Sequence, residues 1–207
     1  MPGQQLQTSA LVLSRQPSNA DAFEQVSVFS DDHGLLLCLR RMPRSTGPRH
    51  EAGPDLFDET ELWLESSNQG RTWFIRECRV LRHHAGIGRS YEALKSAAAL
   101  GNLVLRHPVP PDSLTAVGAL LRQSLQALDD GARPDLVWLK ALYRFVRDEG
   151  LPVKEHWILR LRQEDRNAAD SILPQPIAGQ DAAPGTVARL TRSLEDWVHA
   201  ETEIKLR

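Results

Sequence analysis

The sequence predicts an α+β protein in which a small β-barrel, formed by residues 1–84, precedes an all-helical domain, formed by residues 85–207. Up to about residue 84, apolar and polar residues alternate and β-branched and aromatic residues are frequent, which is typical of half-buried strands. From about Ser90 onward, apolar residues recur at helical spacing. The motif Gly86-Ile-Gly88 lies where the first pattern gives way to the second.

We expect five strands in the first part, over residues 8–16, 22–30, 34–42, 56–66 and 72–83. Polar turns separate most of them; the last is the glycine-containing segment 66–71. Val26 and Val28 fall on one face of the second strand, and alternation places Phe74, Cys78 and Val80 on one face of the fifth.

The segment 43–54 contains three prolines and two glycines, so we expect a long exposed loop between the third and fourth strands. Five strands with one long loop fit a small closed barrel such as the OB-fold. An open sandwich with the same number of strands is the structural alternative.

The second part predicts helices that begin near Ser90, Ser113 and Pro134. The third of these is apolar nearly all round, so we expect it at the centre of a bundle. A last amphipathic helix includes Val187 and Ile204. Before it, residues 174–186 are rich in proline and glycine and predict a flexible loop.

The composition gives no global sign of nucleic-acid binding, because the net charge is −2 and the pI is about 6.4. Any such function must depend on a local patch. Cys38 and Cys78 form no paired-cysteine motif, so the sequence predicts neither a zinc ribbon nor a disulfide framework and favours a reduced, cytoplasmic compartment. Apolar runs are far shorter than the ~20 residues that span a bilayer, so we expect no membrane association.

Arginines form the strongest candidate site. They are Arg40, Arg41, Arg44 and Arg49 after the third strand, joined by Arg71, Arg76, Arg79 and Arg82 around the fifth. Residues 1–84 carry nine arginines and eleven acidic residues, and five of the acids gather between Asp55 and Glu65. A surface on which the charges are segregated in this way can attract a phosphate backbone. The alternative is that these are ordinary solvated arginines.

Aromatic side chains could add base stacking, and Trp63 and Trp73 are the candidates, although tryptophan in a small barrel more often belongs to the core. Adjacent His83 and His84 point to opposite faces of a strand and would chelate a metal poorly. Because no catalytic motif occurs, we expect a protein that is not an enzyme and needs no cofactor.

Several motifs resemble those of the bacterial recombination mediator family RecO. They are Ala10-Leu-Val-Leu13, Ser18-Asn-Ala-Asp21, Val26-Ser-Val-Phe-Ser30, Asp32-His-Gly34, Leu136-Val-Trp-Leu-Lys-Ala-Leu142 and Gly150-Leu-Pro152. Two further segments resemble the family in order and spacing. They are the basic segment after the third strand and the terminal helix, which ends Glu203-Ile-Lys-Leu-Arg207.

The resemblance implies an N-terminal OB-fold, a C-terminal helical domain and a role in DNA repair and recombination. Such a protein binds and anneals single-stranded DNA and works with RecR and single-strand-binding protein to load RecA, in the cytoplasm at the nucleoid. Many family members hold zinc through four cysteines after the Gly-x-Pro turn. This chain has none there, so we expect no zinc, with Trp157 and Ile158 packed in its place.

Two other functions stay open. The acidic balance favours a protein adaptor that has lost nucleic-acid binding and contacts partners through Arg122, Lys140 and Arg144. The acidic residues of segment 55–65 could instead serve a metal-dependent enzyme, although a solvated strand edge explains them as well.

Overall fold

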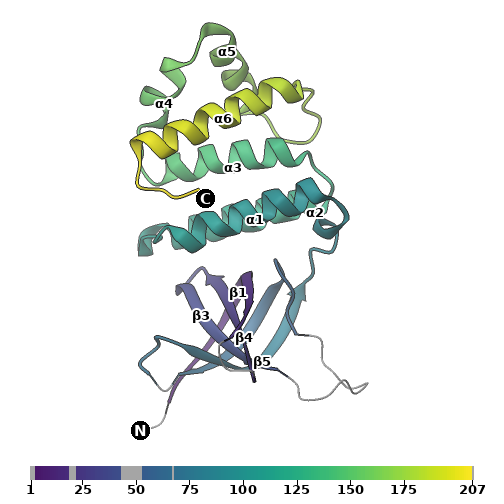
Figure 1. Cartoon of the computed structure of the whole chain (residues 1–207), viewed down its shortest axis with the longest axis vertical. Helices are drawn as coiled ribbons and strands as arrows, with labels where there is room; N and C mark the ends of the chain where they lie inside the picture. The colour runs from purple at the N-terminus through teal and green to yellow at the C-terminus, as the bar shows by residue number, and fades with distance from the viewer. Residues whose placement is uncertain (1–2, 19–21, 43–52, 67, 207) are drawn as a thin grey trace. The chain divides into compact units, whose positions relative to one another are not determined.

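The computed structural model describes residues 3–18, 22–42, 53–66 and 68–206. They form an α+β structure, with a five-stranded sheet followed by helices (Figure 1). The α+β class is therefore confirmed. The chain divides into two compact units: Met1–His84 with Val109–Gly118, which we call the sheet unit, and Ala85–Pro108 with Ala119–Arg207, which we call the helical unit.

The strands of the sheet unit are β1 (Gln4–Pro17), β2 (Phe23–Ser30), β3 (Gly34–Arg41), β4 (Glu59–Ser66) and β5 (Trp73–Arg82). Their pairing order is β1-β2-β3-β5-β4, and β4 also pairs with β1, so the sheet closes on itself. All pairs are antiparallel except β3 with β5, which is parallel. β1 is longer than expected because its first half pairs with β4 and its second half with β2.

Side chains of one parity fill the inside of the closed sheet, as alternation requires. The buried cluster consists of Ala10, Val12, Val26, Val28, Leu36, Cys38, Leu62, Leu64 and Trp73. Val26 and Val28 thus share the inner face, as predicted. Burial raises the pKa of the Cys38 thiol from its ordinary value of 9.0 to about 12, because the core disfavours a thiolate.

Phe74 was expected to share a face with Cys78, and this expectation is wrong. The register of β4 with β5 shifts between Trp63 and Leu64, which leaves one extra residue on β5 near Arg76. This bulge reverses the alternation. Trp73 and Ile75 consequently pack in or against the core together with Cys78, whereas Phe74 lies on the outer face, opposite Glu65 and Leu39.

The segment Val109–Gly118 groups with the sheet, although the sequence predicts it as part of the helical domain. The start of α2 (Leu114–Asp129) lies close to the β2–β3 turn. A Cβ on Gly34 would lie 3.2 Å from the Leu114 side chain, and a Cβ on Gly118 would lie 1.9 Å from the Asp31 carboxylate. Gly34 also has a φ of 69°, so glycine at this position both adopts the backbone conformation of the turn and leaves room for the Leu114 side chain.

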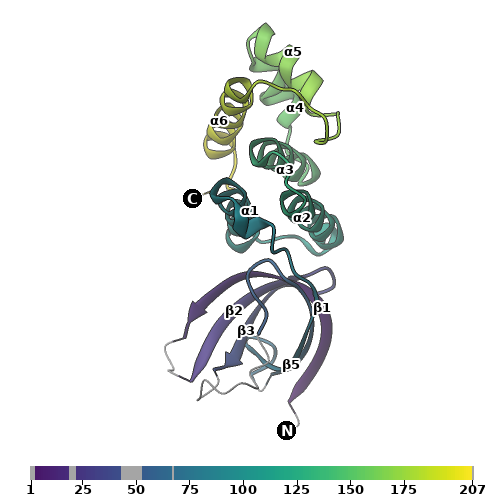
Figure 2. The same ribbon diagram turned by 90° about the vertical axis from the view of Figure 1, so that its right-hand side faces the viewer.

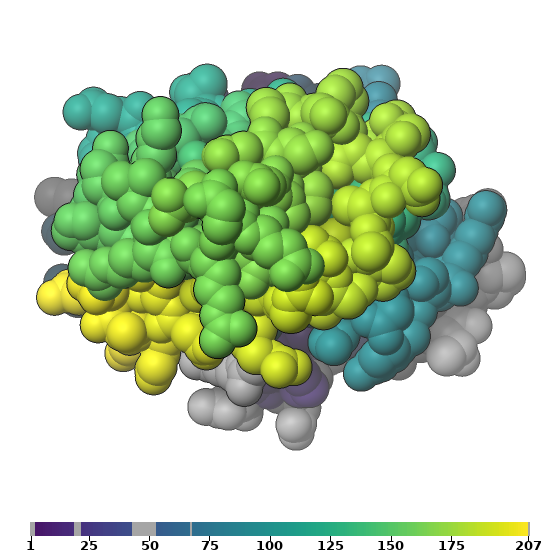
Figure 3. Space-filling view, turned by 90° about the horizontal axis from the view of Figure 1, so that it is seen from above, coloured from purple at the N-terminus to yellow at the C-terminus, as the bar shows by residue number. Residues whose placement is uncertain are grey.

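The helical unit is built from α1 (Tyr91–Arg106), most of α2, α3 (Pro134–Asp148), α4 (Val153–His156), α5 (Gln163–Ile172) and α6 (Pro184–Glu201). Figure 2 shows α1, α3 and α6 roughly end-on and stacked side by side. In Figure 3, α4, α5 and α6 lie together on one face of this unit. The Ser90 hydroxyl caps α1 by accepting a hydrogen bond from the Ala93 amide at 3.3 Å.

α3 is the central helix, as predicted, and its apolar residues are buried from Leu136 to Val146. Trp157 and Ile158 are also buried, as expected, and the Trp157 indole nitrogen donates to the Ser193 hydroxyl at 3.1 Å. α5 was not predicted. The last helix ends at Glu201 rather than including Ile204, although Ile204 is buried in the segment that follows.

The segment before α6 has no regular structure but is held by side chains. Gln180 donates to the carbonyls of Ile172 and Gln175, and Arg133 donates to the carbonyl of Ala182. Across the described residues, no helix is both long and apolar enough to cross a membrane.

Candidate nucleic-acid interface

Two phenylalanines meet on the outer face of the closed sheet. Phe23 on β2 and Phe74 on β5 contact each other edge to face, with ring centroids 5.9 Å apart and an interplanar angle of 68°. Both side chains are half-buried, so part of each ring stays open to solvent. We call these two residues the phenylalanine pair. An exposed aromatic surface of this kind is what unstacked bases bind.

An apolar stripe on β3 leads to the phenylalanine pair. Leu35 and Leu37 project from the outer face and are 46% and 38% exposed, and Leu39 continues the stripe beside Phe74. The next residue of the same parity is Arg41, which pairs with Phe23 in the β2–β3 register. The outer face of β3 therefore carries apolar groups that end in a cation.

Arg41 and Arg76 flank the phenylalanine pair. β3 and β5 are parallel, with Leu39 paired to Phe74, and each arginine lies two residues beyond that pair. Both arginine side chains are exposed. Arg41 forms no ion pair with another described residue, whereas the Arg76 Nε lies 2.6 Å from Glu65 Oε2. Of these two arginines, Arg41 is thus the one without an ion-pair partner among the described residues.

Arg40 points the other way, toward the end of the closed sheet. Its guanidinium lies 3.6 Å from Glu24, whose side chain is only 12% exposed. Arg15 contacts the same carboxylate at 2.8 Å. A Cβ on Gly53 would overlap the Arg40 guanidinium, so the chain passes directly over it. These contacts give Arg40 a structural role in balancing Glu24.

The remaining predicted arginines are spread out. Arg71 is exposed in the turn between β4 and β5, and Arg79 is exposed on β5, where it pairs with Glu61 in the register. Arg44 and Arg49 lie outside the described residues. The structure thus brings Arg41 and Arg76 together around the phenylalanine pair, while Arg40 and Arg79 lie elsewhere.

Glutamates of β4 offset the arginines of β5. Glu65 forms the ion pair with Arg76, Glu61 lies opposite Arg79, and Glu59 lies opposite Arg82. Opposite charges at directly paired positions attract each other across an antiparallel ladder. The arginine and glutamate rows that look separate in the sequence therefore lie side by side. Among the described arginines of the sheet unit, Arg41 and Arg71 have neither a glutamate opposite them in the strand register nor an ion pair with a described residue.

The two candidate tryptophans do not pair with either member of the phenylalanine pair. Trp73 is buried in the core, and Trp63 is half-buried on β4, where it pairs with Gln7 and Glu77. The partly exposed aromatic side chains of this face are therefore phenylalanines, whereas the sequence predicted tryptophans as candidates for base stacking. The sequence signal for this surface is the hairpin expected from strands 22–30 and 34–42, because such a hairpin places Phe23 opposite Arg41.

The acidic residues of segment 55–65 form contacts within the protein. Asp58 is buried, accepts a hydrogen bond from the Asp55 amide at 2.8 Å and lies 3.0 Å from His83 Nδ1. His84 instead contacts the carbonyl of Phe57 at 2.8 Å, so the two histidines diverge. Nowhere in the described part of the chain do three or more His, Cys, Asp or Glu side chains gather as metal ligands.

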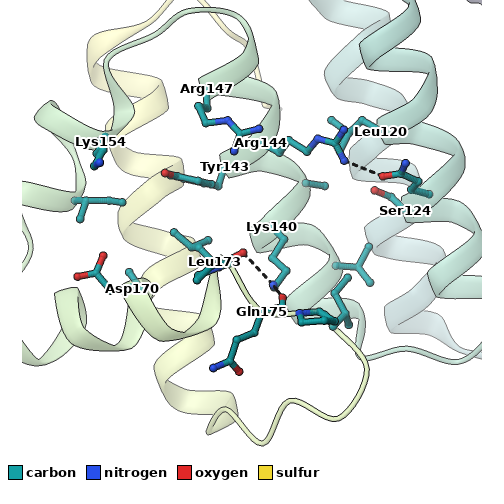
Figure 4. Close-up of a pocket in the computed structure, with 18 residues that line it drawn as sticks. Leu120, Ser124, Lys140, Tyr143, Arg144, Arg147, Lys154, Asp170, Leu173 and Gln175 are labelled. Atoms are coloured by element: carbon teal, nitrogen blue, oxygen red, sulfur yellow. Dashed lines mark hydrogen bonds between the residues drawn. The ribbon is translucent and has the colours of Figure 1, made fainter.

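A separate basic pocket lies within the helical unit. Its volume is about 610 Å³, and it contains Lys140, Arg144, Arg147 and Lys154 around an apolar floor, with Asp170 on one wall (Figure 4). Two of the three predicted partner-binding residues, Lys140 and Arg144, lie one turn apart here on α3. Arg122, which is half-buried on α2, does not line it.

Hydrogen bonds hold the cations of this pocket in place. The Lys140 ammonium donates to the carbonyls of Leu173 and Gln175, and the Arg144 guanidinium donates to Gln123 at 2.8 Å. Partial burial lowers the pKa of Lys140 from its ordinary value, because desolvation disfavours the charged ammonium.

Arg144 and Arg147 also form ion pairs with Asp148, at 3.4 and 2.7 Å. Lys140 and Lys154 are therefore the lining cations without an ion pair among the described residues, and their partly apolar setting suits an anionic group attached to an apolar one.

In the comparisons with known proteins, no family model matches this chain, and no curated protein matches it.

Proposed function

We propose that this protein binds single-stranded nucleic acid on the outer face of β2 and β3 and acts as a DNA recombination mediator of the RecO kind. The observation that carries the binding proposal is the phenylalanine pair flanked by Arg41 and Arg76. Aromatic rings that stack bases, next to cations that contact phosphates, are the general means of binding single strands.

The proposal includes an OB-fold for the closed sheet. The strand order β1-β2-β3-β5-β4, its closure onto β1 and the parallel β3–β5 pair support this assignment. OB-folds bind oligonucleotides with the face of strands 2 and 3 and with the loops between strands 1 and 2 and strands 4 and 5. Phe23 on β2, Arg41 on β3 and Arg71 between β4 and β5 occupy such positions in this chain, and Phe74 lies beside them on β5.

The mediator role rests on the sequence resemblance, and the helical unit would supply its protein contacts. We propose that the basic pocket at Lys140 and Arg144 receives a protein partner, with single-strand-binding protein and RecR as the first to test. The cations and the apolar floor of this pocket favour binding of a partner segment that combines carboxylates with apolar side chains.

The first experiment is a fluorescence-anisotropy titration of a labelled oligo-dT at about 50 and 200 mM salt. We expect binding that weakens with salt. The double variant Arg41→Ala, Arg71→Ala should bind more weakly and flatten the logarithmic salt slope by about 1.4, since each phosphate contact to a single strand contributes about 0.7. Arg162→Ala, which removes an exposed arginine of the helical unit, is the matched control.

One observation favours a second function. Because β4 glutamates offset the β5 arginines, the sheet unit could lack nucleic-acid affinity, and the protein would then be an adaptor that binds partners through its helical unit. Absence of oligo-dT binding at low salt would reject the nucleic-acid proposal. In that case, capture of purified partners that depends on Lys140 and Arg144 would establish the adaptor.

A further inference from the structure

The apolar stripe of β3 extends the phenylalanine pair with side chains that carry no ring. It consists of Leu35, Leu37 and Leu39. The first two are 46% and 38% exposed, and the third lies beside Phe74 in the β3–β5 register. Contiguous exposed apolar side chains are typical of an interaction site, whereas scattered ones are not.

The spacing of the stripe suits a single strand whose bases are unstacked. Side chains two residues apart on a β-strand lie about 6.6 Å apart. This interval is about twice the 3.4 Å rise per nucleotide of a strand in the double helix. A nucleic-acid strand that runs along β3 in an extended form can therefore place one base on Leu35 and the next on Leu37.

β2 supplies polar groups beside the stripe. In the β2–β3 register, Ser27 is paired with Leu37. Gln25 is paired with Leu39. Both polar side chains are half-buried and share the outer face, because Val26 between them lies in the core. An amide and a hydroxyl can form hydrogen bonds with the polar edge of a base, but that edge is the same in thymine and uracil.

Leucine and phenylalanine offer different contacts to a base. A ring stacks on the face of any base, so the phenylalanine pair tolerates every sequence. Leucine contributes apolar contact alone, and thymine is the base that carries an apolar substituent, its C5-methyl group. Burial of one such group raises an affinity about fourfold. The stripe therefore favours thymine over a base that lacks the methyl group.

We propose that the apolar stripe makes this surface selective for thymine over uracil. The C5-methyl groups of two successive thymines pack on Leu35 and Leu37, while a neighbouring base stacks on the phenylalanine pair. The inference rests on the nucleic-acid binding proposed above and adds a base preference to it. Arg41 and Arg76 do not contribute to this preference, because the phosphates of the two kinds of strand are identical.

The test compares labelled oligo-dT with labelled oligo-dU of the same length, each titrated with the full chain and followed by fluorescence anisotropy. The two probes share sugars, phosphates and base-pairing edges and differ only in the C5-methyl groups. We expect oligo-dT to bind about 4- to 16-fold more tightly, for one or two buried methyl groups. The ratio of the two affinities should be the same at about 50 and 200 mM salt, because both probes release the same counterions.

The double variant Leu35→Gln, Leu37→Gln should reduce this ratio to about one. Partial unfolding would lower both affinities equally, so a smaller ratio reports loss of the methyl contact itself. Phe74→Ala should weaken binding of both probes and keep the ratio, since stacking does not require the methyl group. The matched control is Leu81→Gln, which alters a leucine that is 47% exposed and lies seven residues beyond Phe74 on β5; it should change neither affinity.

Three results would overturn the inference. Equal affinities for oligo-dT and oligo-dU would reject the base preference and leave the proposed single-strand binding intact. A preference that persists in the leucine double variant would show that the methyl groups are bound elsewhere. Absence of binding to either probe at low salt would reject both this inference and the proposed nucleic-acid binding.

Discussion

The rings of Phe23 and Phe74 meet edge to face at 5.9 Å, although β2 and β5 do not pair with each other. β3 lies between these strands and pairs with both, so the contact spans three strands of the closed sheet. The contact exists because the bulge in β5 turns Phe74 outward. A local change of register thus creates the aromatic surface on which the nucleic-acid proposal depends.

Phe74→Ala should weaken oligo-dT binding by about 5- to 150-fold, since stacking contributes about 1–3 kcal/mol per base. The salt slope should stay the same, because no phosphate contact is lost. Anisotropy titrations at two salt concentrations measure both quantities. Leu81→Ala removes another exposed apolar side chain of β5 and is the matched control. Phe74→Tyr should retain binding; if it binds as weakly as Phe74→Ala, the ring is not a stacking platform.

Glu65→Gln should strengthen oligo-dT binding about two- to fivefold at low salt and steepen the salt slope by about 0.7. The substitution removes the carboxylate that lies 2.6 Å from Arg76 and leaves the arginine available for a phosphate. The same titrations measure the effect. Glu203→Gln removes one exposed negative charge elsewhere. An equal gain in that variant would show a general effect of net charge and contradict the role given to Arg76.

The strands were predictable because one face of each must enter the core, and this requirement imposes alternation on the sequence. Val26 and Val28 show it plainly, since both are fully buried. The direction of Phe74 was not predictable, because the bulge depends on the register that β5 adopts against β4. α5 was missed because only Ala169 and Ile172 of its residues are buried, which is too few to produce a helical period.

The candidate site was predictable only in part, for a related reason. The sequence places Arg40 and Arg41 in one basic run, but adjacent residues of a strand point to opposite faces. Only the structure shows that Cys38 faces the core, which sends Arg40 toward Glu24 and leaves Arg41 on the outer face. Likewise, the pairing of β4 glutamates with β5 arginines follows from register, which residue order alone does not specify.

Arg40→Ala should destabilise the protein by about 1–2 kcal/mol, because it removes one of the two cations that balance the mostly buried Glu24. Arg41→Ala should change the free energy of unfolding by no more than about 0.5 kcal/mol, since its side chain is exposed and unpaired among described residues. Urea denaturation gives both values. Equal stability losses in the two variants would contradict the structural role assigned to Arg40.

The buried Cys38 thiol should make the protein less stable at alkaline pH. Its pKa is raised from 9.0 to about 12, so the folded state keeps the proton in a range where the unfolded state loses it. The contribution of this group to stability is therefore complete below pH 9 and declines as pH rises toward about 12, at about 1.4 kcal/mol per pH unit. Urea denaturation at about pH 9 and pH 10 should show a smaller loss in Cys38→Ala than in the wild type.

Cys78→Ala is the matched control for this measurement, because the Cys78 thiol is only half-buried. Burial raises its pKa as well, but nearby Arg40 opposes the effect. Cys78→Ala should therefore flatten the alkaline decline less than Cys38→Ala does. If the two variants decline with the same slope as the wild type, neither thiol contributes to the pH dependence, and other groups that titrate in this range account for it.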